Sequence, residues 1–294
     1  GAKEKITQAA KGKDVCILNG DLDDSILASE ELKWVHCCRA GVEKSTKPEV
    51  FERGIILTSS SGRSAPALAE HALMFMLSLT YDLPMLTRAQ KEHKWAVSRE
   101  YSEKTGMYRK TVGVIGLGKT GSEVARLVKS FDMKVLAWDR RRKEAQNVDQ
   151  VYGAENGDNL NELLAQCDYV VLSLELNDQT FHIIDAAQLA AMKKTAFLVN
   201  MGRGGLVNEP AMIEALKNGG IAGAGLDTFE TEPLPSESPL WNLPNVIITP
   251  HITPQLPDKE ERMLDYVYQN IKAYRENGTF VNRVTLRNML TPQK

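Results

Sequence analysis

The sequence predicts an α/β protein of two domains, each built on a doubly wound parallel sheet. At 294 residues the chain is longer than one ordinary domain. Short apolar runs of strand type alternate with helical patterns along most of its length, which is typical of β-α-β units. A glycine-rich turn at residues 116–121 stands between a predicted strand and a predicted helix.

The first domain begins with a helical pattern at residues 6–11. Short strands are then predicted at residues 14–18, 34–38 and 54–58, with helical stretches between them. This alternation favours a small parallel sheet. Because the opening helix has no strand before it, we expect that one opening strand of this sheet is absent from the sequence.

A long apolar helix, rich in Ala, Leu and Met, is predicted at residues 65–79, where it packs in the core or against a second copy. Residues 81–107 are more polar and predict a helix and a loop. From residue 110 onward a run of β-α-β units implies a doubly wound sheet. Its strands are predicted at 111–115, 134–138, 169–174, 196–200, 223–227 and 245–249, and its helices at 121–131, 160–165, 185–192 and 209–217; an amphipathic helix follows at 259–276.

Composition excludes several classes of protein. The formal net charge of −2 lacks the basic excess of a nucleic-acid-binding protein. No apolar run approaches the ~18 residues of a membrane span, and the start has no signal-peptide core. The cysteines show neither metal-ligand spacing nor a disulfide framework, so we expect free thiols, no metal and a cytoplasmic location; they are Cys16, Cys37, Cys38 and Cys167.

The glycine-rich turn has the features of a dinucleotide-binding loop. Gly116 permits a tight turn, Gly118 lets backbone N–H groups approach a pyrophosphate, and Gly121 lets the helix pack closely on the strand. The helix N-terminus, at Lys119 and Thr120, offers unpaired N–H groups and positive potential to phosphates. The alternative is a turn with a structural role only.

Asp139 closes the next strand, where an acidic residue reads the adenosine ribose. Its carboxylate would accept hydrogen bonds from the ribose hydroxyls and repel the extra phosphate of NADP, by about 4 kcal/mol at 4 Å and an effective dielectric constant near 20. Arg140, Arg141 and Arg142 follow at once, either as a solvated turn or as partners for that phosphate. We predict NAD as the cofactor, with NADP the less favoured alternative.

Three further motifs follow in order: Leu-Val-Asn-Met-Gly-Arg-Gly-Gly-Leu-Val-Asn at 198–208, Gly-Ala-Gly-Leu-Asp-Thr-Phe-Glu-Thr-Glu-Pro-Leu-Pro at 223–235, and Thr-Pro-His at 249–251. Together they resemble the signature of the D-isomer-specific 2-hydroxyacid dehydrogenases, and the resemblance runs from the strand at 14–18 through the last helix. It implies two Rossmann-like domains, a dinucleotide-binding domain (65–252) inserted into a flavodoxin-like substrate domain (1–64 and 253–294). It also implies a homodimer and a small 2-oxoacid or 2-hydroxyacid substrate.

The resemblance assigns the catalytic roles to Arg203, Glu232 and His251. An arginine holds carboxylate and carbonyl oxygens through a planar set of donors. A histidine exchanges a proton near neutral pH, and a carboxylate bonded to its ring fixes the tautomer. Glu230 is close to Glu232 in sequence, but Glu232 directly precedes the proline of the motif. We interpret the other histidines as structural or surface residues: His36, His71, His93 and His182.

Further cofactor contacts are implied at the ends of other strands. Asp227 matches the family residue that bonds the nicotinamide carboxamide and so orients the ring. Thr180 and the backbone at 172–173 match positions that line the cofactor, with less specific motifs.

The substrate loop of the first domain is less ordinary. Arg39, Ala40 and Gly41 match a loop whose backbone N–H groups hold the substrate carboxylate in the family, and Gly41 allows close approach. Family members usually have a small residue in place of Arg39. Together with Arg63, it either binds a second anionic group of the substrate or pairs with local acids. Residues 252–257 also depart from the family pattern, which leaves the substrate undetermined.

Three other activities fit parts of this pattern. Formate dehydrogenases are disfavoured because they have a glutamine upstream in place of the acid that Glu232 supplies. Phosphite dehydrogenases are related enzymes, and these motifs alone do not exclude phosphite oxidation. A corepressor that senses NAD(H) belongs to a different functional class, and it would combine slow turnover of every oxoacid with NADH-dependent binding of a protein partner.

Overall fold

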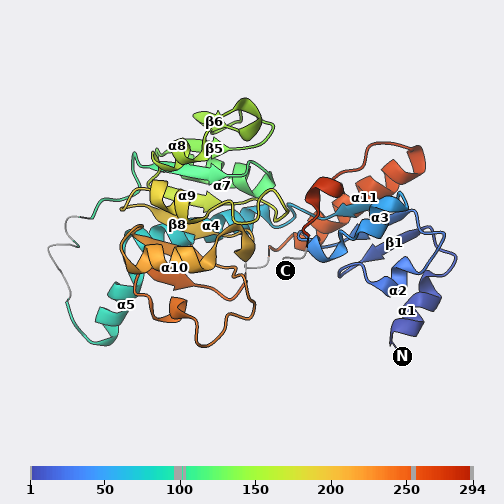
Figure 1. Ribbon diagram of the computed structural model, residues 1–294, viewed down its shortest axis with the longest axis horizontal. Helices are drawn as coiled ribbons and strands as arrows, with labels where there is room; N and C mark the ends of the chain where they lie inside the picture. Colours follow the sequence, from blue (N-terminus) through green and yellow to red (C-terminus); the bar gives the residue numbers. More distant parts are fainter. Residues whose placement is uncertain (1, 96–100, 102–103, 253–255, 292–294) are drawn as a thin grey trace. The chain divides into compact units, whose positions relative to one another are not determined.

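The computed structural model describes residues 2–95, 101, 104–252 and 256–291. The chain forms two compact units (Figure 1). Unit 1 comprises Gly1–Ser64, Glu175–Gln179 and Gln255–Lys294, and unit 2 comprises Ala65–Leu174 and Thr180–Pro254. The naming of these units as substrate domain and dinucleotide-binding domain stays a prediction, and the start of the predicted return segment, 253–255, lies outside the described residues.

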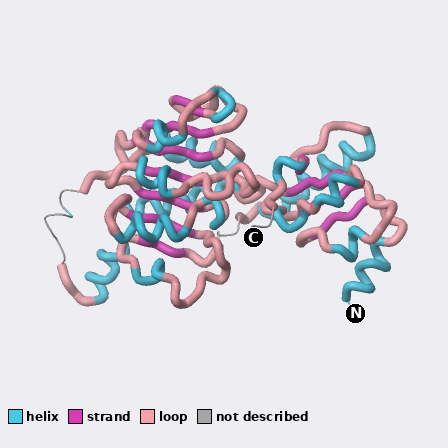
Figure 2. The backbone as a smooth tube through the Cα atoms, viewed as in Figure 1, coloured by secondary structure: helices cyan, strands magenta, loops and turns pink. Residues whose placement is uncertain are grey.

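Unit 2 contains a seven-stranded sheet whose strands lie side by side among helices (Figure 2). Its order is β10-β9-β8-β7-β4-β5-β6, and every neighbouring pair is parallel. The order reverses between β4 and β7, as in a doubly wound Rossmann sheet, and the predicted fold class is confirmed. The strands are β4 (Thr111–Ile115), β5 (Lys134–Trp138), β6 (Gln150–Tyr152), β7 (Tyr169–Leu172), β8 (Phe197–Asn200), β9 (Gly223–Leu226) and β10 (Val246–Ile248).

Helices cover both faces of this sheet. As a result, nearly every residue of its central strands is buried. α4 (Ala65–Thr80) and α7 (Lys119–Lys129) pack side by side on one face. The opposite face carries α8 (Leu160–Leu164), α9 (Ala186–Ala191) and α10 (Glu209–Lys217), with α9 in contact with both of the others. α5 (Leu83–Lys91) follows α4 and has no buried residue.

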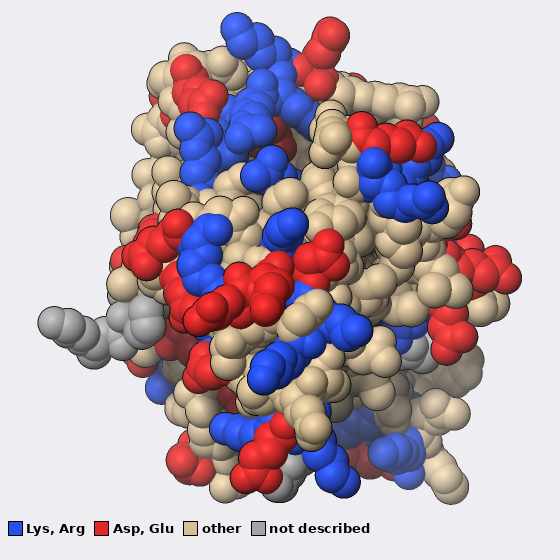
Figure 3. Space-filling view, turned by 90° about the vertical axis from the view of Figure 1, so that its right-hand side faces the viewer, with Lys and Arg blue, Asp and Glu red and all other residues tan. Residues whose placement is uncertain are grey.

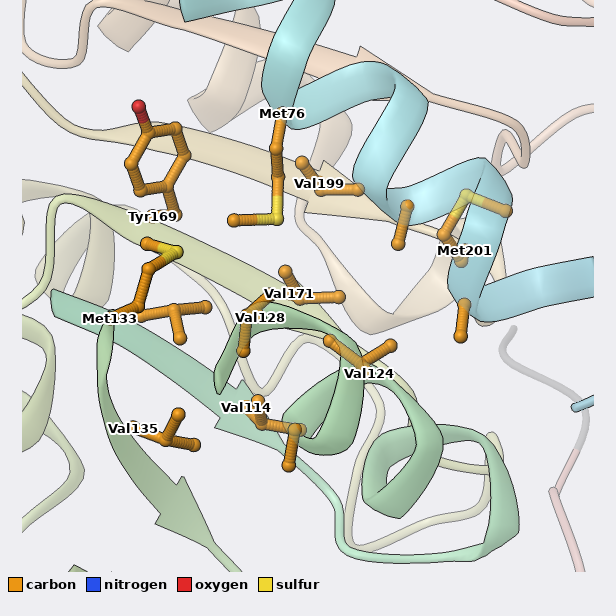
Figure 4. Packing of buried hydrophobic residues seen from close by; sticks show 14 of the residues in the cluster. Met76, Val114, Val124, Val128, Met133, Val135, Tyr169, Val171, Val199 and Met201 are labelled. Carbon is orange, nitrogen blue, oxygen red and sulfur yellow. The ribbon is translucent and has the colours of Figure 1, made fainter. Parts of the chain in front are cut away.

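The core between α4, α7 and the sheet shows why these residues form these elements. Val112 and Val114 are two positions apart in β4 and so lie on the same face of the sheet, within one core cluster. Figure 4 shows Val114 packed near Val124 and Val128 of α7. Phe75 of α4 lies so close to β9 that a Cβ on Gly225 would stand 2.6 Å from its ring. A glycine in the strand therefore sets how closely this helix approaches the sheet.

Unit 1 contains a four-stranded sheet in the order β1-β2-β3-β11. The first three strands are parallel and match the predicted ones, whereas β11 is antiparallel and was not predicted. Its elements are α1 (Ala2–Ala10), β1 (Val15–Leu18), α2 (Asp24–Leu27), β2 (Trp34–Cys37), α3 (Pro48–Glu52), β3 (Ile56–Ser59), α11 (Lys259–Glu276) and β11 (Arg283–Val284).

Short 3-10 helices occur in both units: η1 (Glu43–Ser45), η2 (Ala154–Asn156), η3 (Gly204–Leu206), η4 (Pro239–Asn242) and η5 (Leu286–Asn288).

Charges of both signs lie side by side on the face shown in Figure 3, which agrees with the small net charge. Among the described residues, no helix has both the length and the apolar character needed to cross a bilayer. All four cysteines are free. Burial raises the pKa of Cys37 to about 11 and that of Cys167 to about 12, so both remain protonated thiols at neutral pH.

A buried polar network joins β2 and β3 of unit 1. The His36 ring has no exposed surface, and it lies 2.8 Å from Thr58 Oγ1 through Nδ1 and 3.0 Å from Ser60 Oγ through Nε2. Trp34 Nε1 also donates to Thr58 Oγ1 over 2.9 Å. Burial lowers the pKa of His36 to about 4, so the folded protein holds this ring neutral.

The network predicts a loss of stability in mild acid. Because the pKa of His36 is about 4 when folded and 6.5 when unfolded, the unfolded chain binds the proton first. The contribution to stability is complete above pH 6.5 and is lost towards pH 4, by about 3 kcal/mol. We expect the free energy of unfolding, measured by urea titration, to fall less steeply over this range in His36→Gln than in the wild type. The same substitution at exposed His93 should keep the wild-type slope; equal slopes for all three proteins would contradict the assignment.

Candidate active site

The residues of interest in unit 2 follow the carboxyl ends of its parallel strands, which all lie at one edge of the sheet. The glycine loop follows β4 and Asp139 follows β5, while Arg203, Asp227 and His251 follow β8, β9 and β10. Ligands of doubly wound sheets bind at this edge, where the strand order reverses. β5 and β9 are four strand spacings apart, about 19 Å, so the edge suits an extended molecule with distinct ends.

The glycine loop has the geometry of a phosphate-binding turn. Gly116 has a φ of 102°, which favours glycine, and its carbonyl accepts a hydrogen bond from Ser173 Oγ at 2.7 Å. A Cβ on Gly121 would stand 1.9 Å from the Gly116 oxygen, so no larger residue fits there. Gly118 caps α7, and no atom lies within 4 Å of where its Cβ would be. The loop is thus closed towards the sheet and open at Gly118, with Lys119 as the first helical residue.

The Asp139 carboxylate is held by backbone N–H groups on both sides. Oδ2 accepts from Leu117 N at 3.2 Å, and Oδ1 accepts from Arg141 N and Arg142 N at 3.0 Å each. These bonds tie the end of β5 to the glycine loop and shape the basic turn that follows. Arg140 Nε lies 3.9 Å from Glu155 Oε1.

Arg203 sits in a loop that is fixed by neighbouring backbone. The buried side chain of Asn200 donates to Arg203 O at 2.9 Å and accepts from Gly202 N at 3.1 Å. A Cβ on Gly204 would stand 1.9 Å from the carbonyl carbon of Phe229, so the loops after β8 and β9 are in direct backbone contact. Arg203 Nη1 donates to Gly202 O at 2.7 Å.

Glu232 and His251 form a close pair. His251 Nδ1 lies 2.7 Å from Glu232 Oε2, and Glu232 Oε1 accepts from Phe229 N at 3.0 Å. The side chains of His251 and Glu232 are 48% and 34% exposed, so both reach solvent. A carboxylate in this position holds the proton on Nδ1 and leaves Nε2 for exchange with another molecule.

A second histidine–glutamate pair involves the other glutamate of the motif, Glu230. His182 Nε2 is 2.7 Å from Glu230 Oε1, and the His182 ring stacks on Phe181. Glu230 Oε1 also accepts from Glu209 N at 3.1 Å. Burial, with a smaller effect of the Glu230 charge, raises the pKa of Glu209. The two glutamates of the motif therefore have different histidine partners.

Asp227 is almost fully buried and accepts two hydrogen bonds on one oxygen. Oδ1 accepts from Thr249 Oγ1 at 2.6 Å and from Ile252 N at 3.0 Å. Its contacts with Thr249 and Ile252 link it to the turn that carries His251. Thr180 begins the short turn that leads to His182, with its carbonyl accepting from Ile183 N at 3.1 Å.

The four predicted substrate-binding residues, Arg39, Ala40, Gly41 and Arg63, all belong to unit 1, whereas the predicted catalytic residues belong to unit 2. Arg39 Nη1 pairs with Asp21 Oδ2 at 2.7 Å, and Arg63 Nη1 donates to the carbonyl of Cys38. Ser60 N bonds the carbonyls of both Cys37 and Arg39. Local partners thus hold both arginines, and the loop after β2 is tied to the end of β3.

Sequence reasoning missed several residues that hold the site. Asn200 and Thr249 position backbone or carboxylate groups, and His182 pairs with Glu230. The signal for Asn200 was a polar residue at the end of a buried strand, where only a hydrogen-bonded side chain is tolerated. Within the described residues, no cluster of three or more His, Cys, Asp or Glu side chains is arranged to hold a metal ion.

Known proteins are similar to this chain in sequence and in fold. The family model for the "D-isomer specific 2-hydroxyacid dehydrogenase, NAD binding domain" matches residues 73–253. The chain is 34% identical over 279 residues to a glyoxylate reductase of Korarchaeum cryptofilum, covering 93% of this chain and 83% of that protein. It is also 34% identical over 290 residues to the D-3-phosphoglycerate dehydrogenase of Methanocaldococcus jannaschii, covering 98% of this chain but only 54% of that protein.

Solved structures of two reductases have a fold similar to that of this chain. The NADPH-dependent glyoxylate/hydroxypyruvate reductase of Sinorhizobium meliloti, in complex with NADP and sulfate, has a TM-score of 0.82 and 26% identity, covering 95% of this chain and 87% of that one. A glyoxylate reductase of Paecilomyes thermophila has a TM-score of 0.79 and 27% identity, with coverages of 96% and 88%. With the family model spanning most of unit 2, the chain belongs to the D-isomer specific 2-hydroxyacid dehydrogenase family, oxidoreductases that use a nicotinamide dinucleotide.

Proposed function

We propose that this protein reduces a small 2-oxoacid to the D-2-hydroxyacid with NADH, and catalyses the reverse oxidation, using Arg203, Glu232 and His251. The observation that carries the proposal is the 2.7 Å contact between His251 Nδ1 and Glu232 Oε2, at the same sheet edge as the glycine loop. A nicotinamide dinucleotide supplies or accepts the hydride when bound. Names of the relatives support this chemistry, since several are glyoxylate reductases.

Each residue has a distinct part in this proposal. Arg203 binds the substrate carboxylate and carbonyl oxygen, because a guanidinium offers two parallel donors to such a pair. His251 gives the carbonyl oxygen a proton from Nε2, and Glu232 stabilises the imidazolium and fixes its orientation.

The glycine loop fits a pyrophosphate because Gly118 has open space where a side chain would stand. Gly116, Gly121 and the N-terminus of α7, at Lys119 and Thr120, would complete this phosphate site, and Asp227 and Thr180 would contact the nicotinamide part of the cofactor. We propose NAD over NADP because Asp139 places a carboxylate at the end of β5. Two observations favour NADP as the alternative cofactor. Four structures with a similar fold contain NADP or NADPH. In this chain, Arg140 and the two arginines after it could pair with the extra phosphate.

The substrate proposed first is glyoxylate, or another oxoacid with one carboxylate. Arg39 pairs with Asp21, and Arg63 with a backbone carbonyl, so both guanidiniums already have local partners in unit 1. A second anionic group on the substrate would have to compete with them. This favours the glyoxylate reductases over the phosphoglycerate dehydrogenases among the relatives.

We also propose a homodimer with an isologous two-fold interface in the cytoplasm. Met74, Tyr81 and Leu83 are 41%, 50% and 50% exposed at the end of α4 and the start of α5, and a second copy would cover these apolar side chains. The four free thiols suit a reducing compartment.

Replacing His251 by Asn should lower kcat at least 100-fold, because proton transfer by a positioned side chain contributes that much. The Kd of NADH, measured by fluorescence titration, should stay near its wild-type value. His182→Asn is the matched control, since it disrupts a His–Glu pair of equal length; its kcat should change only a few-fold. Near-normal turnover by His251→Asn would remove this residue from the mechanism.

Replacing Asp139 by Ala should raise the ratio of kcat/KM for NADPH to that for NADH at least tenfold. The substitution removes a charge that repels the 2′-phosphate by several kcal/mol. Glu155→Gln changes charge beside the same basic turn without altering the ribose-reading position, and its ratio should stay near the wild-type value. If the unmodified protein already prefers NADPH, the cofactor assignment is wrong.

A panel of 2-oxoacids tests the substrate by the rate of NADH oxidation. Glyoxylate should exceed phosphohydroxypyruvate and 2-oxoglutarate in kcat/KM, and Arg39→Met should affect the monoanion and the dianions equally. A selective loss with dianions would instead assign Arg39 to a second anionic group. No turnover of any member, with NADH still bound, would favour phosphite oxidation or a corepressor.

A further inference from the structure

His71 lies inside unit 2 and connects a core helix to the sheet edge that carries the proposed active site. It is 6% exposed on α4. Its Nε2 atom lies 3.1 Å from Thr249 Oγ1, and Thr249 Oγ1 donates to Asp227 Oδ1 at 2.6 Å. A continuous chain of hydrogen bonds therefore runs from α4 through the residue after β10 to the residue after β9.

The direction of each hydrogen bond in this chain follows from the number of hydrogens. Thr249 has one hydroxyl hydrogen, and the carboxylate of Asp227 can only accept. Thr249 must therefore accept from His71, which places a proton on Nε2. His71 Nδ1 is buried with no partner among the described residues, and burial lowers the pKa of His71, opposed in part by the Asp227 charge. A neutral ring with hydrogen on Nε2 satisfies these contacts.

The other end of this series of hydrogen bonds holds two proposed functional groups, the Asp227 carboxylate and the turn of His251. Asp227 Oδ1 also accepts from Ile252 N at 3.0 Å, so both bonds fix the rotation of the carboxylate. His251 lies between Thr249 and Ile252 in sequence, and its N–H donates to Thr249 O at 3.0 Å. The turn that presents His251 is thus held against Asp227 by Thr249 and Ile252.

We propose that His71 is a positioning residue: by donating to Thr249 it orients both the Asp227 carboxylate and the turn of His251 for hydride and proton transfer. This rests on the proposed function, which assigns the nicotinamide contact to Asp227 and the proton to His251. The hydrogen bond, and not merely the packing of the ring, is what positions these groups. The ring itself stacks on Phe75 with centroids 4.9 Å apart, so the two roles are separable by substitution.

Two substitutions distinguish the hydrogen bond from the packing. His71→Gln keeps an N–H donor near the position of Nε2 but loses the ring, whereas His71→Phe keeps a ring against Phe75 but has no donor. We expect kcat to fall about tenfold in His71→Phe, with a raised KM for NADH, and to stay within about twofold in His71→Gln. The Kd of ADP-ribose, which lacks the nicotinamide, should be unchanged in both.

A third substitution reaches the same hydrogen bond from the other side. Thr249→Val removes the hydroxyl with little change in shape and does not touch α4. It should reduce kcat at least as much as His71→Phe, and adding His71→Phe to it should have little further effect, because both break one chain. The melting temperature shows whether His71→Phe is folded. If it folds poorly, the kcat of Thr249→Val alone still tests the hydrogen bond.

The results separate this inference from the proposed function. If His71→Phe keeps wild-type kcat, or His71→Gln loses as much as His71→Phe, the positioning role is wrong. Asp227→Asn and His251→Asn, assayed in parallel, test the proposed function itself. When these two lose turnover and His71→Phe does not, only the positioning role falls; when they also turn over normally, the proposed function fails first.

Discussion

All seven strands of the large sheet run in the same direction, and this constraint decides where the chemistry of the protein can be. Parallel strands need crossover helices, and these bury both faces of the sheet. Polar side chains are then admitted only at the strand ends. The carboxyl edge collects the loops after β4, β5, β8, β9 and β10, although residues 116 and 251 are far apart in sequence.

Close packing turns this edge into a fixed frame. Gly121, Gly204 and Gly225 each occupy a place where a Cβ would overlap a neighbouring atom. Buried polar groups complete the frame, since Asn200 bonds two backbone groups of its own loop and Asp227 bonds two groups of the turn after β10. A buried polar group without partners is costly, so these side chains hold the loops in a single arrangement. Unit 1 has its own polar network around His36.

The sequence allowed most of the fold to be predicted because its patterns are local and strong. α10 begins and ends where predicted, with Asn208 accepting from Ala211 N at its start. β6 and β11 were missed because they have only three and two residues and depend on pairing with distant partners. Such pairing is set by the rest of the sheet, and propensity alone does not reveal it.

For the candidate site, the family resemblance identified residues that the structure places at one edge, and it already assigned Glu232 to His251. The pairing of Glu230 with His182 is visible only in the fold. No sequence pattern indicates the contact of His71 with Thr249, because the two residues are 178 positions apart in the chain. A contact between residues so far apart in sequence depends on the packing of α4 against the sheet.

The contact at Gly204 couples the shapes of the two loops that meet there. With no room for a side chain between residue 204 and Phe229, neither loop can lengthen or change course without displacing the other. A side chain added at position 204 should therefore displace the segments of Arg203 and Glu232 together.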